Sequence, residues 1–176
     1  LYQRDTGGDE WFQIYATGLT GEAVQLTEAG TRNQGAAFSP DGKVLAWSRA
    51  TKGSAEYSIY VADPSDARSA KSVYREVGSV GPSDVSADYT KILFTRSISN
   101  RESKLFMLDV ASGKATQIAP KVSKVLYQNA RLSRDGRSVY AIPTKDSDFG
   151  RLVQIDIASG KDTVLTPDVK WDVETF

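Results

Sequence analysis

The 176-residue sequence contains no cysteine and no histidine. Without cysteine the chain forms neither a disulfide nor a thiolate zinc site. Without histidine it lacks the most common general base and the most common side-chain metal ligand. We therefore expect this chain to carry no catalytic residue, no metal site and no cofactor of its own.

The sequence also lacks an excess of charge of either sign and any long apolar run. Lysine plus arginine number 22, and so do aspartate plus glutamate. Nucleic-acid binding needs a clustered positive excess, so we expect no nucleic-acid partner. A membrane-spanning helix needs roughly 20 apolar residues in a row, and none is present. The chain opens on Leu1 without a signal-peptide pattern, which we interpret as a segment of a longer protein. The compartment stays open between bacterial cytoplasm and periplasm.

One short phrase recurs three times along the chain at a fixed interval. Its serines are spaced by 47 residues, and a second series of aspartates, each after a strand-like run, is spaced by 46 and 47 residues. The phrases are Phe38–Lys43, Val85–Thr90 and Leu132–Arg137, and the aspartates are Asp63, Asp109 and Asp156. A strand-rich repeat with a period just above about 40 residues is typical of propeller blades. The sequence therefore predicts an all-β fold, a β-propeller with four-stranded antiparallel blades.

The repeat sets the predicted blade boundaries. Short apolar runs rich in β-branched and aromatic residues alternate with turn residues, and no segment keeps an apolar period of about 3.6 residues. We therefore expect four strands in each blade and almost no helix. The predicted blades are residues 34–78, 81–120 and 127–167, together with a first blade at 1–30 that residues 171–176 complete.

The first blade lacks an innermost strand in this interpretation. An unpaired strand edge exposes backbone donors and acceptors, and proteins rarely leave it uncorrected. We hypothesise that residues 171–176 pair with the strand at 1–5. The pairing gives either a closed ring of four blades within one chain or a homodimer in which two chains form a ring of eight.

Turn residues separate the predicted strands. Asp41-Gly42 and Asp135-Gly136 follow the first strand of their blades, where glycine supplies the positive φ of a tight hairpin turn. Tyr89 stands at the glycine position of the third blade, so we expect that turn to be strained or of another type. A second turn, between the third and fourth strands, carries Asp109 with Gly113 and Asp156 with Gly160.

The phrase Phe38-Ser39-Pro40-Asp41-Gly42-Lys43 and its copies resemble the repeats of the TolB propeller and of prolyl-oligopeptidase-type (S9) serine peptidases. Two further stretches, Arg4–Tyr15 and Leu165–Phe176, resemble blades of bacterial peptidases of that family. The resemblance covers essentially the whole chain.

Resemblance to the peptidases implies a non-catalytic propeller that gates the access of short peptides to a separate α/β-hydrolase domain. That domain would carry the Ser-Asp-His triad and would be this segment's partner in the same protein. No part of the triad is present here, because the sequence has neither histidine nor a Gly-x-Ser-x-Gly elbow. The alternatives are a TolB-like periplasmic protein-binding propeller and, third, a lyase or sugar hydrolase built on a propeller.

Several side chains have a functional interpretation beside a simpler one. Asp41, Asp88 and Asp135 form a possible carboxylate array, but equivalent turn positions lie a blade apart. Some dipeptidyl relatives hold a peptide's free amino terminus with acidic loop residues, a role open to Asp9 and Glu10. The remaining candidates are a calcium loop at 146–148, a domain contact at Arg96, Asn100, Arg101 and Glu102, and ligand stacking on Trp11, Trp47 and Trp171.

Overall fold

The computed structural model describes residues 1–18, 21–119, 124–144 and 149–176, which hold only strands and turns. Within those ranges no helix has the length and hydropathy needed to cross a bilayer. The strands are β1 (Tyr2–Arg4), β2 (Gln13–Ala16), β3 (Val24–Gln25), β4 (Thr31–Phe38), β5 (Leu45–Thr51), β6 (Glu56–Asp63), β7 (Asp66–Val77), β8 (Val80–Val85), β9 (Lys91–Ser99), β10 (Glu102–Asp109), β11 (Ala115–Ala119), β12 (Tyr127–Leu132), β13 (Ser138–Pro143), β14 (Val153–Asp156) and β15 (Asp162–Val164).

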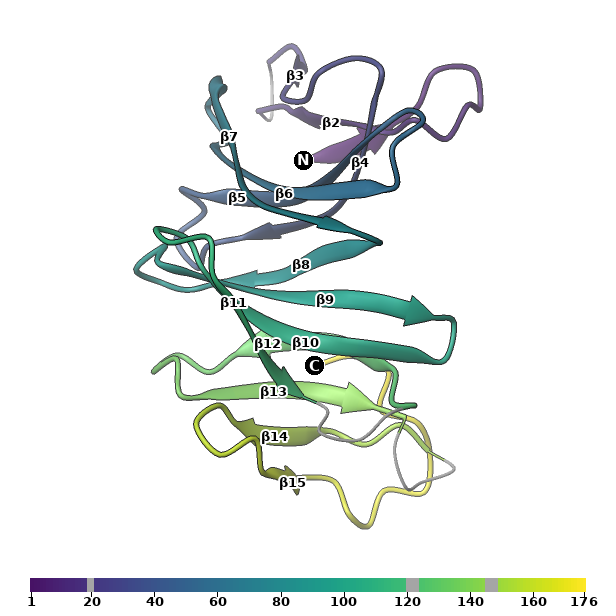
Figure 1. Cartoon of the computed structure of the whole chain (residues 1–176), viewed down its shortest axis with the longest axis vertical. Coiled ribbons are helices and arrows are strands. Elements are labelled where there is room, and N and C mark those ends of the chain that lie inside the picture. Colours follow the sequence, from purple (N-terminus) through teal and green to yellow (C-terminus); the bar gives the residue numbers. More distant parts are fainter. Residues whose placement is uncertain (19–20, 120–123, 145–148) are drawn as a thin grey trace.

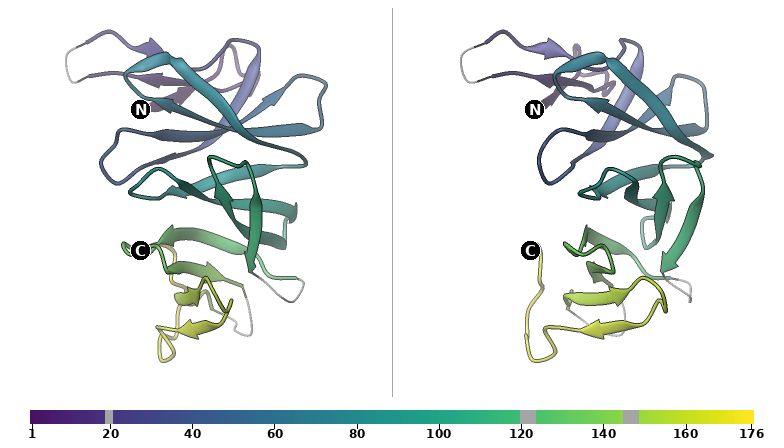
Figure 2. Two further views of the ribbon diagram at one scale, coloured as in Figure 1. Left: turned by 60° about the vertical axis from the view of Figure 1, so that its left-hand side comes forward. Right: turned by 90° about the vertical axis from the view of Figure 1, so that its left-hand side faces the viewer.

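These strands form four antiparallel sheets stacked along the long axis of the molecule (Figure 1). The first sheet has the order β1-β2-β3, and the other three are β4-β5-β6-β7, β8-β9-β10-β11 and β12-β13-β14-β15. Successive sheets are rotated into an open arc, and both chain termini lie on its concave side (Figure 2). The arrangement confirms the prediction of an all-β propeller. The three four-stranded blades span 31–77, 80–119 and 127–164.

The two central strands of each blade are the most apolar, because both of their faces are covered. Ile92, Leu93 and Phe94 follow one another in β9 and are all 0% exposed. Alternate residues therefore point to opposite neighbours: Leu93 packs toward the fourth sheet, whereas Ile92 and Phe94 pack toward the second. Unbroken apolar runs in the sequence correspond to strands with a blade on either side.

A polar network lies inside the interface between the first and second sheets, next to the apolar cluster of Ile14, Leu26, Leu45, Trp47 and Ala62. Asn33 is 0% exposed. Its Oδ1 accepts a hydrogen bond from Trp47 Nε1 at 3.0 Å, and its Nδ2 donates to Phe12 O at 3.1 Å. Gln13 donates from Nε2 to Thr31 O at 2.6 Å and accepts at Oε1 from Thr27 Oγ1 at 2.7 Å. These polar groups satisfy one another, which makes their burial tolerable.

The hairpin turns repeat with the same geometry in the three complete blades. Gly42 and Gly136 have φ of +74° and +68°, and each N–H donates to the serine carbonyl three residues earlier at 2.9 Å. Tyr89 makes the same bond to Ser86 O at 2.9 Å with φ of +61°. The third blade therefore uses the same turn, with a bulky residue in a backbone region that favours glycine.

Residues 171–176 lie against the fourth blade and not beside β1. Val173 N donates to Gly150 O at 2.9 Å, and Asn129 Nδ2 donates to Glu174 O at 2.8 Å. Among the described strands β1 pairs with β2 alone, so the first sheet has three strands. Because these hydrogen bonds hold residues 171–176 against the fourth blade, the structure does not show a four-blade ring closed within one chain. Strand exchange between two chains stays a prediction.

One buried hydroxyl yields a stability prediction. Ser48 is 0% exposed, and within the described part of the chain its Oγ has no hydrogen-bond partner. Burying an unpaired hydroxyl costs about 1–3 kcal/mol. We expect Ser48→Ala to leave the free energy of unfolding unchanged or to raise it by about 1 kcal/mol. Urea unfolding measures this free energy. Ser39→Ala should lower it instead, because Ser39 Oγ donates a hydrogen bond to Asp41 Oδ1 at 2.8 Å. A clear loss of stability in Ser48→Ala would contradict the expectation.

Candidate functional site

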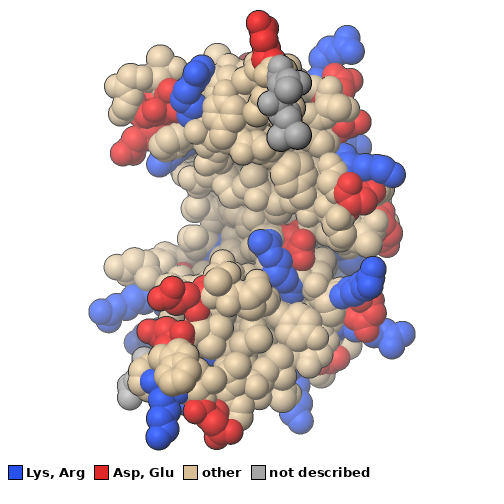
Figure 3. Space-filling view, turned by 180° about the vertical axis from the view of Figure 1, so that it is seen from behind, with Lys and Arg blue, Asp and Glu red and all other residues tan. Residues whose placement is uncertain are grey.

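The concave side of the arc is lined by the innermost strands β4, β8 and β12. Each of these strands has an irregularity at the same place in the repeat, between Gln34 and Ala37, between Pro82 and Asp84, and between Gln128 and Ala130. Gly35 and Asn129 take positive φ at two of the bulges. A bulge redirects side chains, so the strands present polar groups to the axis of the arc. Seen from behind in Figure 3, this face is hollowed, with charged side chains of both signs around it.

A polar pair links the third and fourth blades on this surface. Asp84 Oδ2 accepts a hydrogen bond from Leu132 N at 2.8 Å, and its Oδ1 accepts one from Val85 N at 2.9 Å. The guanidinium of Arg131 donates through Nη1 to the carbonyl of Ser83. Arg131 is exposed, whereas Asp84 is half-buried. Solvent or a ligand therefore reaches the guanidinium of Arg131 more readily than the carboxylate of Asp84. The sequence pattern did not single out either residue, because neither belongs to the repeated phrase.

The carboxylates of Asp9 and Glu10, the two acidic candidates of the first blade, do not contact each other in the described structure. Asp9 Oδ1 accepts a hydrogen bond from Trp11 N at 2.9 Å and so stabilises its own turn. Glu10 is exposed, has φ of +59°, and lies with Oε2 3.9 Å from Arg32 Nη2. That nearby cation opposes the binding of a peptide ammonium group at Glu10. Capture of an amino terminus by Asp9 and Glu10 stays a prediction.

The repeated aspartates serve their own turns. Asp41, Asp88 and Asp135 each accept a hydrogen bond at Oδ1 from the serine hydroxyl two residues earlier, at 2.7–2.8 Å. Asp109 and Asp156 each accept bonds from the N–H and hydroxyl of the serine three residues later. Among the described residues no group of histidine, cysteine, aspartate or glutamate has the arrangement of a metal site. The carboxylates form separate turn caps.

Hydrogen bonds to these carboxylates make the turns sensitive to acid. Bonds from the Ser86 hydroxyl and from Thr90 lower the pKa of Asp88 to about 2, and a bond from Ser133 lowers the pKa of Asp135. A depressed folded-state pKa contributes stability that is complete above the unfolded value of about 3.9 and is lost as the pH falls toward about 2. We expect the urea midpoint to fall between about pH 4 and pH 2.

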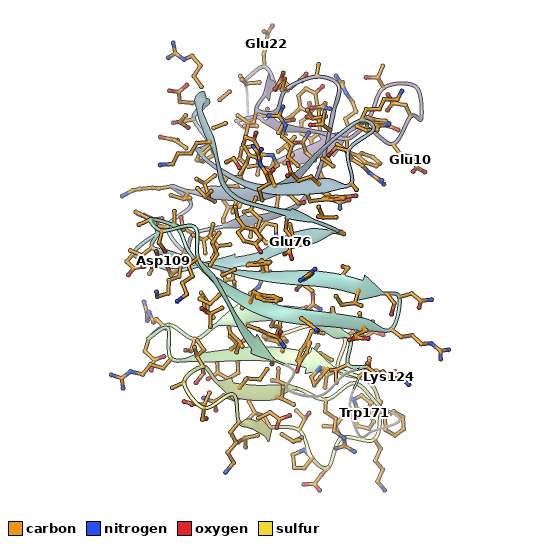
Figure 4. All side chains as sticks on the ribbon, viewed as in Figure 1. Glu10, Glu22, Glu76, Asp109, Lys124 and Trp171 are labelled. Atoms are coloured by element: carbon orange, nitrogen blue, oxygen red, sulfur yellow. The ribbon has the colours of Figure 1, made fainter. Side chains whose placement is uncertain are left out.

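Amide substitutions test that expectation. Asp88→Asn and Asp135→Asn should make the fall of the urea midpoint below about pH 4 shallower, because fewer carboxylates then take up protons when the protein unfolds. Glu22→Gln is the matched control, because Glu22 extends into solvent in Figure 4. An identical pH profile in the two aspartate variants and the parent protein would contradict the prediction.

The long hairpin between β9 and β10 borders a groove at the opposite rim from the aspartate turns. Asn100, Arg101 and Glu102 line this groove of about 670 Å³ together with Ser99, Lys124, Leu126 and Thr144. Arg96 lies apart, with Nη1 2.7 Å from Glu76 Oε1. In Figure 4, Glu10, Lys124 and Trp171 share one edge of the molecule, and Asp109 lies on the other. Contact of this hairpin with another domain stays a prediction.

The three tryptophans have different environments. Trp47 is 1% exposed and stacks on Tyr60 with ring centroids 5.6 Å apart, so blade packing accounts for it. Trp11 is half-buried, whereas Trp171 is 70% exposed. No ligand-stacking surface joins the three. The calcium loop suggested at 146–148 falls outside the described residues.

No protein-family model matches the sequence, and no curated protein matches it. Solved structures do match. TolB from Acinetobacter baumannii superimposes with a TM-score of 0.67 at 22% identity over 92% of this chain and 39% of that chain. A prolyl endopeptidase gives 0.62 at 15% identity over 96% and 28%, and an oligogalacturonate lyase in complex with manganese gives 0.61 at 16% over 86% and 46%.

Identities this low establish the fold alone. The chain is a β-propeller of the kind present in TolB and in prolyl endopeptidases. It spans 28–46% of the lengths of these three similar chains, so their activities and partners do not transfer to it as findings.

Proposed function

We propose that the chain is a non-catalytic part of a β-propeller that gates the access of peptides to an α/β-hydrolase domain of the same protein. The concave surface of β4, β8 and β12 carries this proposal, because the residues described there offer a polar lining without a reactive group. Arg131 is exposed there, and its guanidinium carries further N–H groups beside the Nη1 that donates to Ser83 O. Backbone groups of an extended peptide need such partners when they leave water.

Steric selection follows from the rigidity of the blades. Their interfaces exclude solvent, since Leu105, Leu108 and Val139 are all 0% exposed. Packed cores deform little, so an axial passage built from such blades admits extended peptides and excludes folded proteins. A protein of this kind cleaves short peptides without a dedicated specificity pocket in the propeller.

Labelling of the intact protein with a fluorophosphonate probe tests the gating role. A serine nucleophile outside this chain would be labelled, and peptides would be cleaved while folded proteins would not. Arg131→Glu should then change the KM for peptides of ten residues more than the KM for dipeptide substrates, because only the longer peptides reach the axial surface. Absence of labelling would reject the peptidase assignment.

The second candidate is a TolB-like protein-binding propeller without a hydrolase. It is favoured by the higher TM-score and identity of the Acinetobacter TolB, 0.67 and 22%, against 0.62 and 15% for the prolyl endopeptidase. In this case the axial surface holds a segment of a partner protein. The intact protein would resist fluorophosphonate, and Arg131→Glu would weaken partner binding without any effect on hydrolysis.

A further inference from the structure

A small apolar pocket opens between the second and third blades, on the rim that carries the aspartate turns. It has a volume of about 280 Å³. Its floor consists of aliphatic side chains from both blades, Val44, Val61, Val85, Ile92 and Val110. Ligand pockets in proteins begin at about 300 Å³ and combine apolar walls with a few polar groups. This one is of a size for a single amino-acid side chain.

The repeat places an equivalent pocket between the third and fourth blades, and the two differ in charge. Asp63 of the first pocket corresponds to Asp109 of the second, and Val44 corresponds to Lys91. Lys91 Nζ lies 3.7 Å from Asp109 Oδ2, so the second pocket neutralises its own acid. Valine replaces that cation in the first pocket, and Asp63 has no ion-pair partner in the described ranges.

A lysine faces the same pocket from the neighbouring strand. Lys71 of β7 is paired in register with Val61 of β6, so its side chain lies on the face that lines the pocket. It is exposed, and no described carboxylate lies within ion-pair distance of it. Thr116 holds the corresponding place opposite Met107 in the next blade. The first pocket therefore presents one cation and one anion that do not neutralise each other.

Tyr89 forms the remaining wall and has no counterpart in the repeat. The equivalent pocket has Gly136 at that position. The Tyr89 backbone has φ of +61°, and its phenol donates a hydrogen bond to Asp41 Oδ2 of the second blade. A non-glycine residue in this region carries a backbone strain of about 1 kcal/mol or more, and such strain persists mainly where the side chain has a use. Here the ring encloses the pocket.

We propose that this pocket binds a small zwitterion with an apolar side chain, an α-amino acid such as leucine. The side chain occupies the aliphatic floor beside Tyr89. The carboxylate pairs with Lys71 and the ammonium group with Asp63. This inference concerns the rim and not the concave surface, so it stands whether or not the gating role is correct.

Titration of the intact, isotopically labelled protein with leucine, followed by NMR, tests the proposal. Saturable shifts of Val44, Val61 and Tyr89 are expected in the millimolar range. N-acetyl-leucine lacks the ammonium group and leucinamide lacks the carboxylate, so each should bind about tenfold more weakly. In Leu-Gly-Gly the two charges are far apart, so it should bind as weakly as leucinamide; binding equal to that of leucine would contradict the pairing of both charges in one pocket.

Matched variants locate the site. Lys71→Met and Asp63→Asn should each weaken leucine binding about tenfold, and Asp63→Asn keeps the Oδ1 that accepts the Ser65 N–H at 2.8 Å. Tyr89→Gly copies the residue of the two equivalent turns and so preserves the fold while it removes the wall. Lys114→Met alters the equivalent pocket and is the control. No saturable shift in the parent protein, or equal binding by Lys71→Met, would overturn the proposal.

Discussion

Replacing Asn33 with alanine is expected to lower the free energy of unfolding by about 3 kcal/mol or more. The variant loses the acceptor of Trp47 Nε1 and one of the two donors to Phe12 O, both inside the first blade interface. The Asn33 amide also lies 3.0 Å from Thr31 Oγ1 and 3.2 Å from Gln13 Oε1. Each buried group left unpaired costs about 1–3 kcal/mol, and a small cavity adds to the loss.

Urea unfolding followed by tryptophan fluorescence measures this effect, because Trp47 itself reports on the interface. Asn100→Ala is the matched control. Asn100 is exposed at the tip of the β9–β10 hairpin, and its replacement should change stability by less than about 0.5 kcal/mol. Similar losses in the two variants would show that the buried network contributes little.

Truncation of Phe94 to alanine should destabilise the protein by about 3–5 kcal/mol. Phe94 is 0% exposed at the interface of the second and third blades. Its ring stacks on Phe106 with centroids 5.2 Å apart and lies 5.1 Å from Tyr74 of the preceding blade. Because blades contact only their neighbours, the cavity weakens the contact that joins the two halves of the arc.

Calorimetry and urea unfolding both measure the loss, and Phe38→Ala serves as the control. Phe38 is 40% exposed at the end of β4, so its removal should cost less than half as much. A second consequence follows from the stacked architecture. If the interface fails locally, the Phe94→Ala variant should unfold in two steps, with blades one and two separating from blades three and four. Equal losses for the two phenylalanines would contradict the assigned interface.

The sequence repeat predicted the architecture because the residues that determine the turns recur with it. Ser39, Ser86 and Ser133 recur with the aspartate two residues later, and their hydrogen bonds create the same turn three times. The predicted blade at 34–78 compares with strands at 31–77, and the blade at 81–120 compares with strands at 80–119. Turn chemistry is local, so nearby residues suffice to specify it.

The sequence pattern did not predict the contacts between blades. The hydrogen bond from Tyr89 to Asp41 and the one from Leu132 N to Asp84 each join residues 48 positions apart. The sequence marked Tyr89 only as a departure from glycine, and it gave no sign of Asp84, Arg131 or Lys71. The tail at 171–176 is instructive too, since its resemblance to a new strand did not indicate that Gly150 and Asn129 would bind it.

The sequence by itself determined the blade: its period, its strand order and its turns, all of which arise from interactions within about 47 residues. Only the tertiary structure decided how the blades meet, which polar groups line the concave surface, and why one rim pocket keeps an unneutralised cation and anion while its equivalent does not. These features depend on the rotation between sheets and on side chains from two repeats at once. A repeated motif specifies one module, but the faces between modules are set by their packing.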